Sequence, residues 1–216
     1  VLIIFPAVLV FVVPEFEFMR AFYRGDRSLW LAFWGTAALI EWGTLALVLA
    51  TFREKLGALR EVGFPLTPVR REKIVGGAVL GFFIVLAIAG AGTPQDFLPN
   101  VPEGARMFVP PADLSSRLFW VFMALTAAIV EETLWRGMVL TELKKLNWHP
   151  VLAVAASSLS FAYFHGGHYQ DPGTFAMRFF AGVAFSALYL KTKSLKWPIL
   201  IHFLLDAALL AAIQYS

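Results

Sequence analysis

Apolar runs, separated by polar, basic or proline-containing stretches, make up most of this sequence. Unlike strands, the runs show no alternation of apolar and polar positions, and most approach the ~20 residues that a helix needs to cross a bilayer. They predict an all-α bundle with about seven membrane spans, the first of them incomplete. The runs cover residues 1–13, 29–51, 74–92, 118–140, 151–165, 174–190 and 197–215.

The composition fits this prediction. Hydrophobic residues make up 59% of the chain and charged residues 15%, and the mean hydropathy is +0.70. Soluble domains are usually about half apolar and a quarter charged. We therefore expect one integral-membrane domain over residues 1–216, multi-pass, in the cell membrane if the source is prokaryotic, with membrane lipids as neighbours. The chain has no Cys, which excludes thiol catalysis, thiolate metal ligands and disulfides.

Basic residues in the predicted loops indicate an orientation. With the N-terminus inside, the inner loops hold eleven Lys or Arg, and the outer regions hold six. Cytoplasmic loops usually carry the excess of Lys and Arg, so this orientation is favoured. The net charge of +3 therefore indicates membrane topology, and we expect no nucleic-acid partner. The six outer residues are Arg20, Arg24, Arg27, Arg106, Arg117 and Arg178.

The run at residues 118–140 contains three charges, Glu131, Glu132 and Arg136. Each opposes insertion by roughly 2.5–3.5 kcal/mol near a helix centre, or on the order of 8–10 kcal/mol together. Glu132 and Arg136 are four residues apart on one helix face and can form an ion pair. Glu131 points about 100° away and lacks that partner, so it is either a structural hydrogen-bonding group or a functional acid.

Two later apolar runs contain groups that could pair with Glu131. His165 follows Phe161 by four residues, and His202 precedes Asp206 by four. Buried separately, each would cost several kcal/mol, whereas one wet cavity could satisfy them together. Straight helices starting at the same surface would place Glu131, His165 and His202 at depths of roughly 15, 20 and 9 Å. That spread, roughly 10 Å, would need tilted or lowered helices to close.

In this order the three motifs resemble those of the CPBP family, the CAAX proteases and bacteriocin-processing enzymes, also called the ABI family of intramembrane glutamic proteases. The motifs are Glu131-Glu132 with Arg136, Phe161 with His165, and His202 with Asp206. The resemblance covers about residues 118–210, which we take as the predicted catalytic core.

The resemblance implies metal-independent hydrolysis of a peptide bond within the membrane. By it, Glu131 and His165 would activate a water, and His202 and Asp206 would stabilise the oxyanion. The family often has Asn at the last position, and since an ionised carboxylate cannot donate, Asp206 could orient His202 instead. Glu132 and Arg136 would be structural or substrate-orienting. The substrate would be a peptide or protein with a hydrophobic or lipidated segment, such as a CAAX protein, a leader peptide or a sorting tail.

The same chemistry follows from the residues without the family name. Amide hydrolysis needs a base beside the water and donors aimed at the developing oxyanion. A carboxylate in apolar surroundings becomes a better base, and a neighbouring imidazole can assist it. A second imidazole, on another helix, can act as the donor.

The motifs of other protease classes are absent from the sequence, and two other functions stay open. The chain has no Gly-x-Ser-Gly turn for a serine type, only one intramembrane Asp, and no His-Glu-x-x-His zinc motif. We expect no cofactor. The alternative is a zinc site formed by Glu131, His165 and His202, with His168 as a possible further ligand. A transporter or immunity-type binding protein could use the same charges as a proton relay. Glu41, another intramembrane acid, fits either a relay or an interhelical hydrogen bond.

Overall fold

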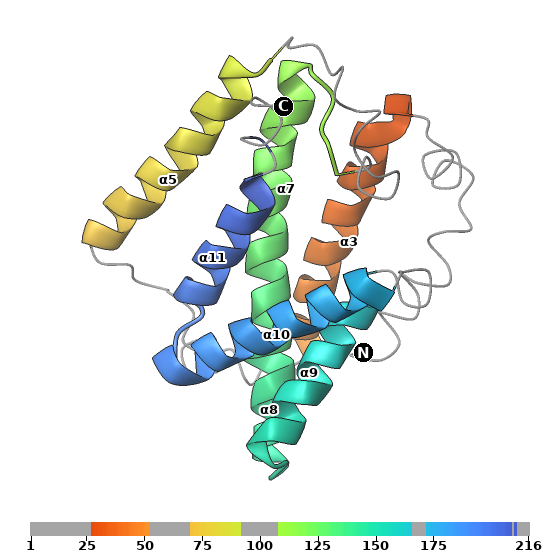
Figure 1. Ribbon diagram of the computed structural model, residues 1–216, viewed down its shortest axis with the longest axis vertical. Coiled ribbons are helices and arrows are strands. Elements are labelled where there is room, and N and C mark those ends of the chain that lie inside the picture. The colour runs from red at the N-terminus through yellow and green to blue at the C-terminus, as the bar shows by residue number, and fades with distance from the viewer. Residues whose placement is uncertain (1–26, 52–69, 92–107, 166–171, 209, 211–216) are drawn as a thin grey trace.

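The computed structural model describes residues 27–51, 70–91, 108–165, 172–208 and 210. Within these ranges the regular structure is helical, as the apolar runs predict (Figure 1). A short 3-10 turn, Arg27–Leu29, leads into the first long helix, and a π-helical segment, Thr133–Val139, follows α7. The helices are α3 (Trp30–Thr51), α5 (Arg70–Ala89), α7 (Leu114–Glu132), α8 (Leu140–Lys145), α9 (Pro150–Phe164), α10 (Pro172–Thr192) and α11 (Lys196–Ala207).

Helix α7 is the centre of the bundle. It packs against α3, α5 and α11, and Figure 1 shows it running between them. The largest apolar cluster joins these helices and includes Trp30, Phe83, Trp120 and Phe203. Helices α9 and α10 pack closely on each other near the other end of α7, and both α10 and α11 are inclined to α7 in this view.

Three of the helices in the described ranges are long and apolar enough to cross a bilayer. They are Trp30–Ala50, the continuous helix Leu114–Lys145, and Pro172–Thr192. Two shorter apolar helices, Gly76–Ala89 and Pro150–Phe164, accompany them in the described part of the chain. The protein is therefore an all-helical integral membrane protein.

Helix α7 begins four residues before the apolar run that predicts it. Asp113 caps its first turn, because the Asp113 Oδ1 accepts a hydrogen bond from the Ser116 N–H at 2.9 Å. Arg117, which the sequence assigns to an outer loop, is instead fully buried within α7. Its Nε donates to the Ala87 carbonyl at 3.0 Å, where α5 ends and carbonyls lack helical partners.

Two glycine positions differ in what surrounds them. The Gly77 and Gly81 spacing in α5 suggests either a close helix contact or simple membrane composition. Among the described residues nothing lies within 4 Å of a Cβ built at either, so no close contact exists there. At Gly182 in α10, an added Cβ would lie 2.9 Å from the Ser158 Cβ, so α9 and α10 approach closely at this point.

Several sequence predictions lie outside the described residues. These are the first run, the loops around it, most of the basic stretch between α3 and α5, and the end of the last run. The possible ligand His168 lies outside them as well.

Candidate functional site

The chain departs from α-helical geometry directly after the two adjacent glutamates. Residues Thr133–Val139 form a π-helix, a feature that is rare and frequently found at functional sites. The Trp135 carbonyl accepts from the Leu140 N–H, five residues on, and from the Ser157 hydroxyl of α9 at 3.0 Å. A side chain of a neighbouring helix therefore braces the altered segment that carries Arg136.

Glu132 and Arg136 form the predicted ion pair, and both are fully buried. The Arg136 Nη1 lies 2.9 Å from the Glu132 Oε1, and the Arg136 Nη2 donates to the Gly182 carbonyl of α10 at 3.3 Å. The guanidinium also lies over the Phe161 and Phe185 rings, 4.5 and 5.2 Å from their centroids. Arg136 thus connects α7, α9 and α10.

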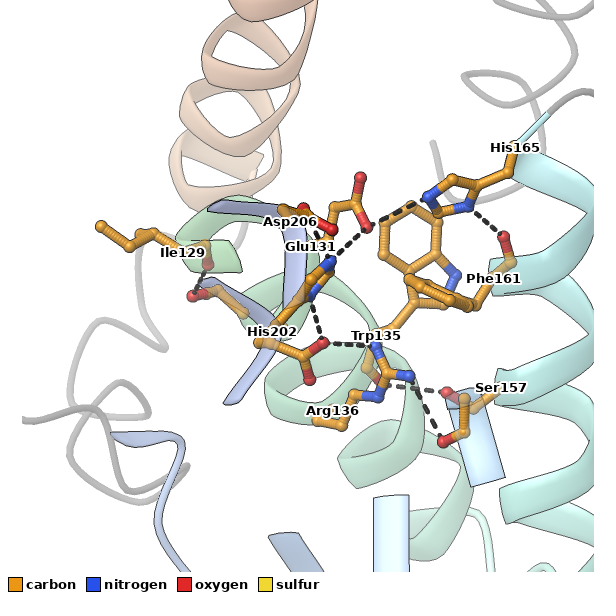
Figure 2. Close-up of polar contacts among 12 residues, drawn as sticks. Ile129, Glu131, Trp135, Arg136, Ser157, Phe161, His165, His202 and Asp206 are labelled. Carbon is orange, nitrogen blue, oxygen red and sulfur yellow. Dashed lines mark hydrogen bonds and ion pairs between the residues drawn. The ribbon is translucent and has the colours of Figure 1, made fainter. Parts of the chain in front are cut away.

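His202 lies among three carboxylates. Its Nδ1 is 2.9 Å from the Glu132 Oε1, and its Nε2 is 3.4 Å from the Asp206 Oδ2 and 3.8 Å from the Glu131 Oε2 (Figure 2). The Phe185 ring stacks on the imidazole, with centroids 5.2 Å apart and an interplanar angle of 19°. Since both ring nitrogens face carboxylates, two N–H donors satisfy this environment better than one.

Glu131 lies between the two histidines. Its Oε2 is 3.4 Å from the His165 Nε2, a distance that is long for a direct hydrogen bond. The His165 Nδ1 is 2.8 Å from the Phe161 carbonyl, and a carbonyl only accepts, so Nδ1 carries a hydrogen. In neutral His165 the Nε2 is therefore an acceptor that faces Glu131.

The three predicted motifs thus converge, although the sequence estimate of their depths separates them by roughly 10 Å. That estimate is wrong because it treats the helices as straight, parallel and aligned. Figure 1 shows α9 and α11 inclined to α7, and the contacts to Glu131 come from both. The estimate also ignores the π-helical segment beside Glu131.

The cluster is enclosed on one side and accessible on the other. The side chains of Glu131 and His202 are 5% and 8% exposed, whereas those of His165 and Asp206 are 23% and 36% exposed. Glu131 is therefore approached from the side of His165 and Asp206, while Glu132 and Arg136 close the opposite side.

Sequence reasoning missed several residues of this arrangement. Phe185 and Gly182 come from a run with no charged motif, and Arg136 and His202 reach them only through packing of α10. The bond between Glu132 and His202 was also missed, because it joins residues seventy positions apart. The spacing Gly182–Phe185–Ser186 on one buried face of α10 was the available signal.

Among the described residues, no three His, Asp or Glu side chains are arranged to hold a metal ion. The site as described is a set of carboxylates and imidazoles in direct contact. Such a set can hold a water, take a proton from it and donate hydrogen bonds to a developing anion.

Residues 113–208 match the model of a family described as type II CAAX prenyl endopeptidase Rce1-like. This segment is similar to that family. It spans α7 to α11 and contains the three motifs, so the match confirms the resemblance inferred from them. The match supports a CAAX-type intramembrane endopeptidase acting on a protein or peptide. No curated protein matches the chain. No solved structure matches it either.

Proposed function

We propose that this protein is a glutamic intramembrane endopeptidase in which Glu131 and His165 activate the attacking water. The observation that supports it is the Glu131 carboxylate, which contacts imidazole nitrogens from two other helices. With hydrogen on Nδ1, the His165 Nε2 accepts one hydrogen bond from a water and the Glu131 Oε2 accepts the other. Two acceptors then leave an oxygen lone pair free for the substrate carbonyl.

The steps of hydrolysis can be assigned to these groups. Glu131 takes a proton as the water oxygen bonds to the carbonyl carbon, and a tetrahedral oxyanion forms. The His202 Nε2–H donates to this oxyanion, while Glu132 holds the ring at Nδ1. The C–N bond then breaks, and the proton on Glu131 passes to the leaving amine. The second proton of the water stays on the new carboxyl group, so the products are a carboxylic acid and a free amine.

The proposed substrate has a hydrophobic or lipidated segment next to the scissile bond. The site lies between apolar helices, and a segment that partitions into lipid reaches it without crossing bulk water. CAAX proteins, leader peptides and C-terminal sorting tails all share this property.

Glu131→Gln tests the mechanism. It keeps the size of the side chain and removes the base, so we expect at least about a hundredfold loss of kcat. Purified protein is compared with the variant on farnesylated CAAX peptides and on membrane extracts, with new termini read by mass spectrometry. Unchanged thermal melting shows that the fold is retained. Cleavage that survives Glu131→Gln contradicts the glutamic mechanism, and the absence of any cleavage favours a relay or binding protein.

Metal independence is tested separately. We expect full activity after exhaustive chelation, with no stoichiometric metal by elemental analysis, because the carboxylate and imidazoles act directly on water. Activity that is lost on chelation and returns with zinc would support the alternative site at Glu131, His165 and His202.

A further inference from the structure

Glu41 is a buried carboxylate that the proposed mechanism does not use. It lies in the middle of α3 and is 9% exposed. Its Oε2 is buried and has no hydrogen-bond partner among the described residues. The interhelical hydrogen bond expected for Glu41 is therefore not made by this oxygen within the described residues. A buried acceptor without a partner costs about 1–3 kcal/mol.

Packing of α3 places Glu41 at the level of the catalytic cluster. One turn before it, Ala38 belongs to the apolar cluster that contains Phe203 and Ala207, the neighbours of His202 and Asp206. One turn after it, Leu45 belongs to the cluster that contains Val130 and Leu134, which flank the two glutamates of α7. Residues 38, 41 and 45 share one helix face, so Glu41 faces the site between these clusters.

One further observation agrees with this placement. The next residue, Trp42, donates its indole N–H to the Thr126 hydroxyl of α7 at 3.2 Å, which fixes α3 against α7 five residues before Glu131. The helix that carries Glu41 is therefore held directly against the helix that carries the two glutamates.

The other carboxylates of the cluster have basic neighbours. Glu132 pairs with Arg136, Asp206 lies beside His202, and Glu131 lies beside the imidazole nitrogens of His165 and His202. Among the described residues, no donor reaches the Glu41 Oε2. An isolated carboxylate in an apolar interior is strongly disfavoured. When a substrate fills the site, we therefore expect Glu41 to be neutralised, either by a positive charge on the substrate or by a proton.

We propose that Glu41 forms a cation subsite of the peptidase and binds a basic side chain of the substrate, a lysine or an arginine close to the scissile bond. This assignment rests on the proposed function, since it names a feature of the substrate of that same site. The long apolar stem of lysine or arginine can lie along α3 and α7, and the charged end then reaches the buried carboxylate. Asp206, the most exposed carboxylate of the cluster, lies at the accessible side.

The proposal predicts a substrate preference that depends on Glu41. The probes are farnesylated CAAX peptides in which one residue at a time, on either side of the scissile bond, is lysine or the uncharged norleucine. At one position, we expect lysine to raise kcat/KM of the wild-type protein at least about tenfold, because a desolvated charge pair forms. Glu41→Gln, which replaces the carboxylate by an amide of the same size, should abolish this preference, so that the lysine and norleucine peptides are cleaved with equal kcat/KM.

The controls separate the possible outcomes. Glu142→Gln removes a partly exposed carboxylate paired with Lys145 on α8, away from the site, and should keep the lysine preference. Equal cleavage of lysine and norleucine peptides at every position overturns the subsite, as does a preference that survives Glu41→Gln.

Binding to the inactive protein separates this inference from the proposed function. In the Glu131→Gln background, the lysine peptide should bind at least about tenfold more tightly than the norleucine peptide, and adding Glu41→Gln should remove the difference. If wild-type protein cleaves no peptide, the proposed function fails, while this comparison still decides for or against Glu41.

Discussion

At the scale of residues, the two adjacent glutamates of α7 have different surroundings. Glu131 contacts the exposed side of the cluster, where His165 and Asp206 are accessible. Glu132 is fully buried, and its Oε1 accepts from both Arg136 and the His202 Nδ1. One carboxylate thus lies at the accessible side, and the other accepts from Arg136 and His202 in the interior.

Glu132→Ala should therefore destabilise the protein strongly. It leaves Arg136 buried without its counter-ion and the His202 Nδ1 without a partner, and breaking a buried pair in this way costs about 3–5 kcal/mol. We expect a lower melting temperature in detergent, a lower folded yield and reduced kcat. Glu132→Gln keeps an oxygen acceptor and should be milder.

The matched control for this prediction is Glu142→Ala. Glu142 pairs with Lys145 at 3.0 Å, but the side chains are 31% and 46% exposed, so the expected cost is at most about 1 kcal/mol. Equal melting temperatures for the two alanine variants would show that the Glu132–Arg136 pair does not stabilise the protein.

At the scale of elements, the site depends on how α9 and α10 meet. Gly182 of α10 lies against Ser158 of α9, and its carbonyl accepts from Arg136. Phe161 of α9 and Phe185 of α10 then lie on the same guanidinium. A single close contact between two helices therefore sets the position of Arg136 and, through Glu132, that of His202.

Gly182→Ala should separate these two helices. The added Cβ meets the Cβ and backbone of Ser158, which cannot rotate away, so we expect a loss of about 1–3 kcal/mol in stability and a lower kcat. Gly81→Ala in α5 is the control, because nothing lies within 4 Å of its Cβ among the described residues. Alanine there should be neutral or slightly stabilising. The reading of Gly182 fails if both variants melt and turn over like wild type.

At the scale of the whole molecule, the residues of the site come from α7, α9, α10 and α11, while Glu41 of α3 lies between the two apolar clusters that flank the site. The structure places the start of α7 and the end of α8 at opposite ends of one long helix (Figure 1). With Arg117 buried in α7, the predicted outer side holds even fewer exposed basic residues than the sequence indicates. The expected orientation, with the N-terminus inside, is thereby favoured further.

Single cysteines can test this orientation, because the chain contains none. Lys145→Cys and Lys191→Cys should be protected from a membrane-impermeant maleimide in intact cells and should react after lysis. Ser115→Cys, at the start of α7, should react in intact cells. All three positions are exposed in the structure, so accessibility to reagent is set by the membrane. The reverse pattern would invert the predicted topology.

The sequence by itself determined the fold class and the candidate groups. Long apolar runs can only form helices in lipid, where every backbone polar group needs an internal partner, and charged groups within those runs stand out by their cost. Glu131, His165, His202 and Asp206 were found in this way. The pairing of Glu132 with Arg136 followed from helical spacing alone.

Only the tertiary structure decided how these groups meet. Helix inclination and the π-helical segment after Glu132 bring to one place residues whose depths a straight-helix estimate separates. The contacts of His202 with Glu132 and of Arg136 with Gly182 join distant positions, and the buried oxygen of Glu41 is visible only once α3 lies against α7. Spacing along one helix fixes neighbours on that helix, whereas contacts between helices depend on crossing angles and on where small residues allow close approach.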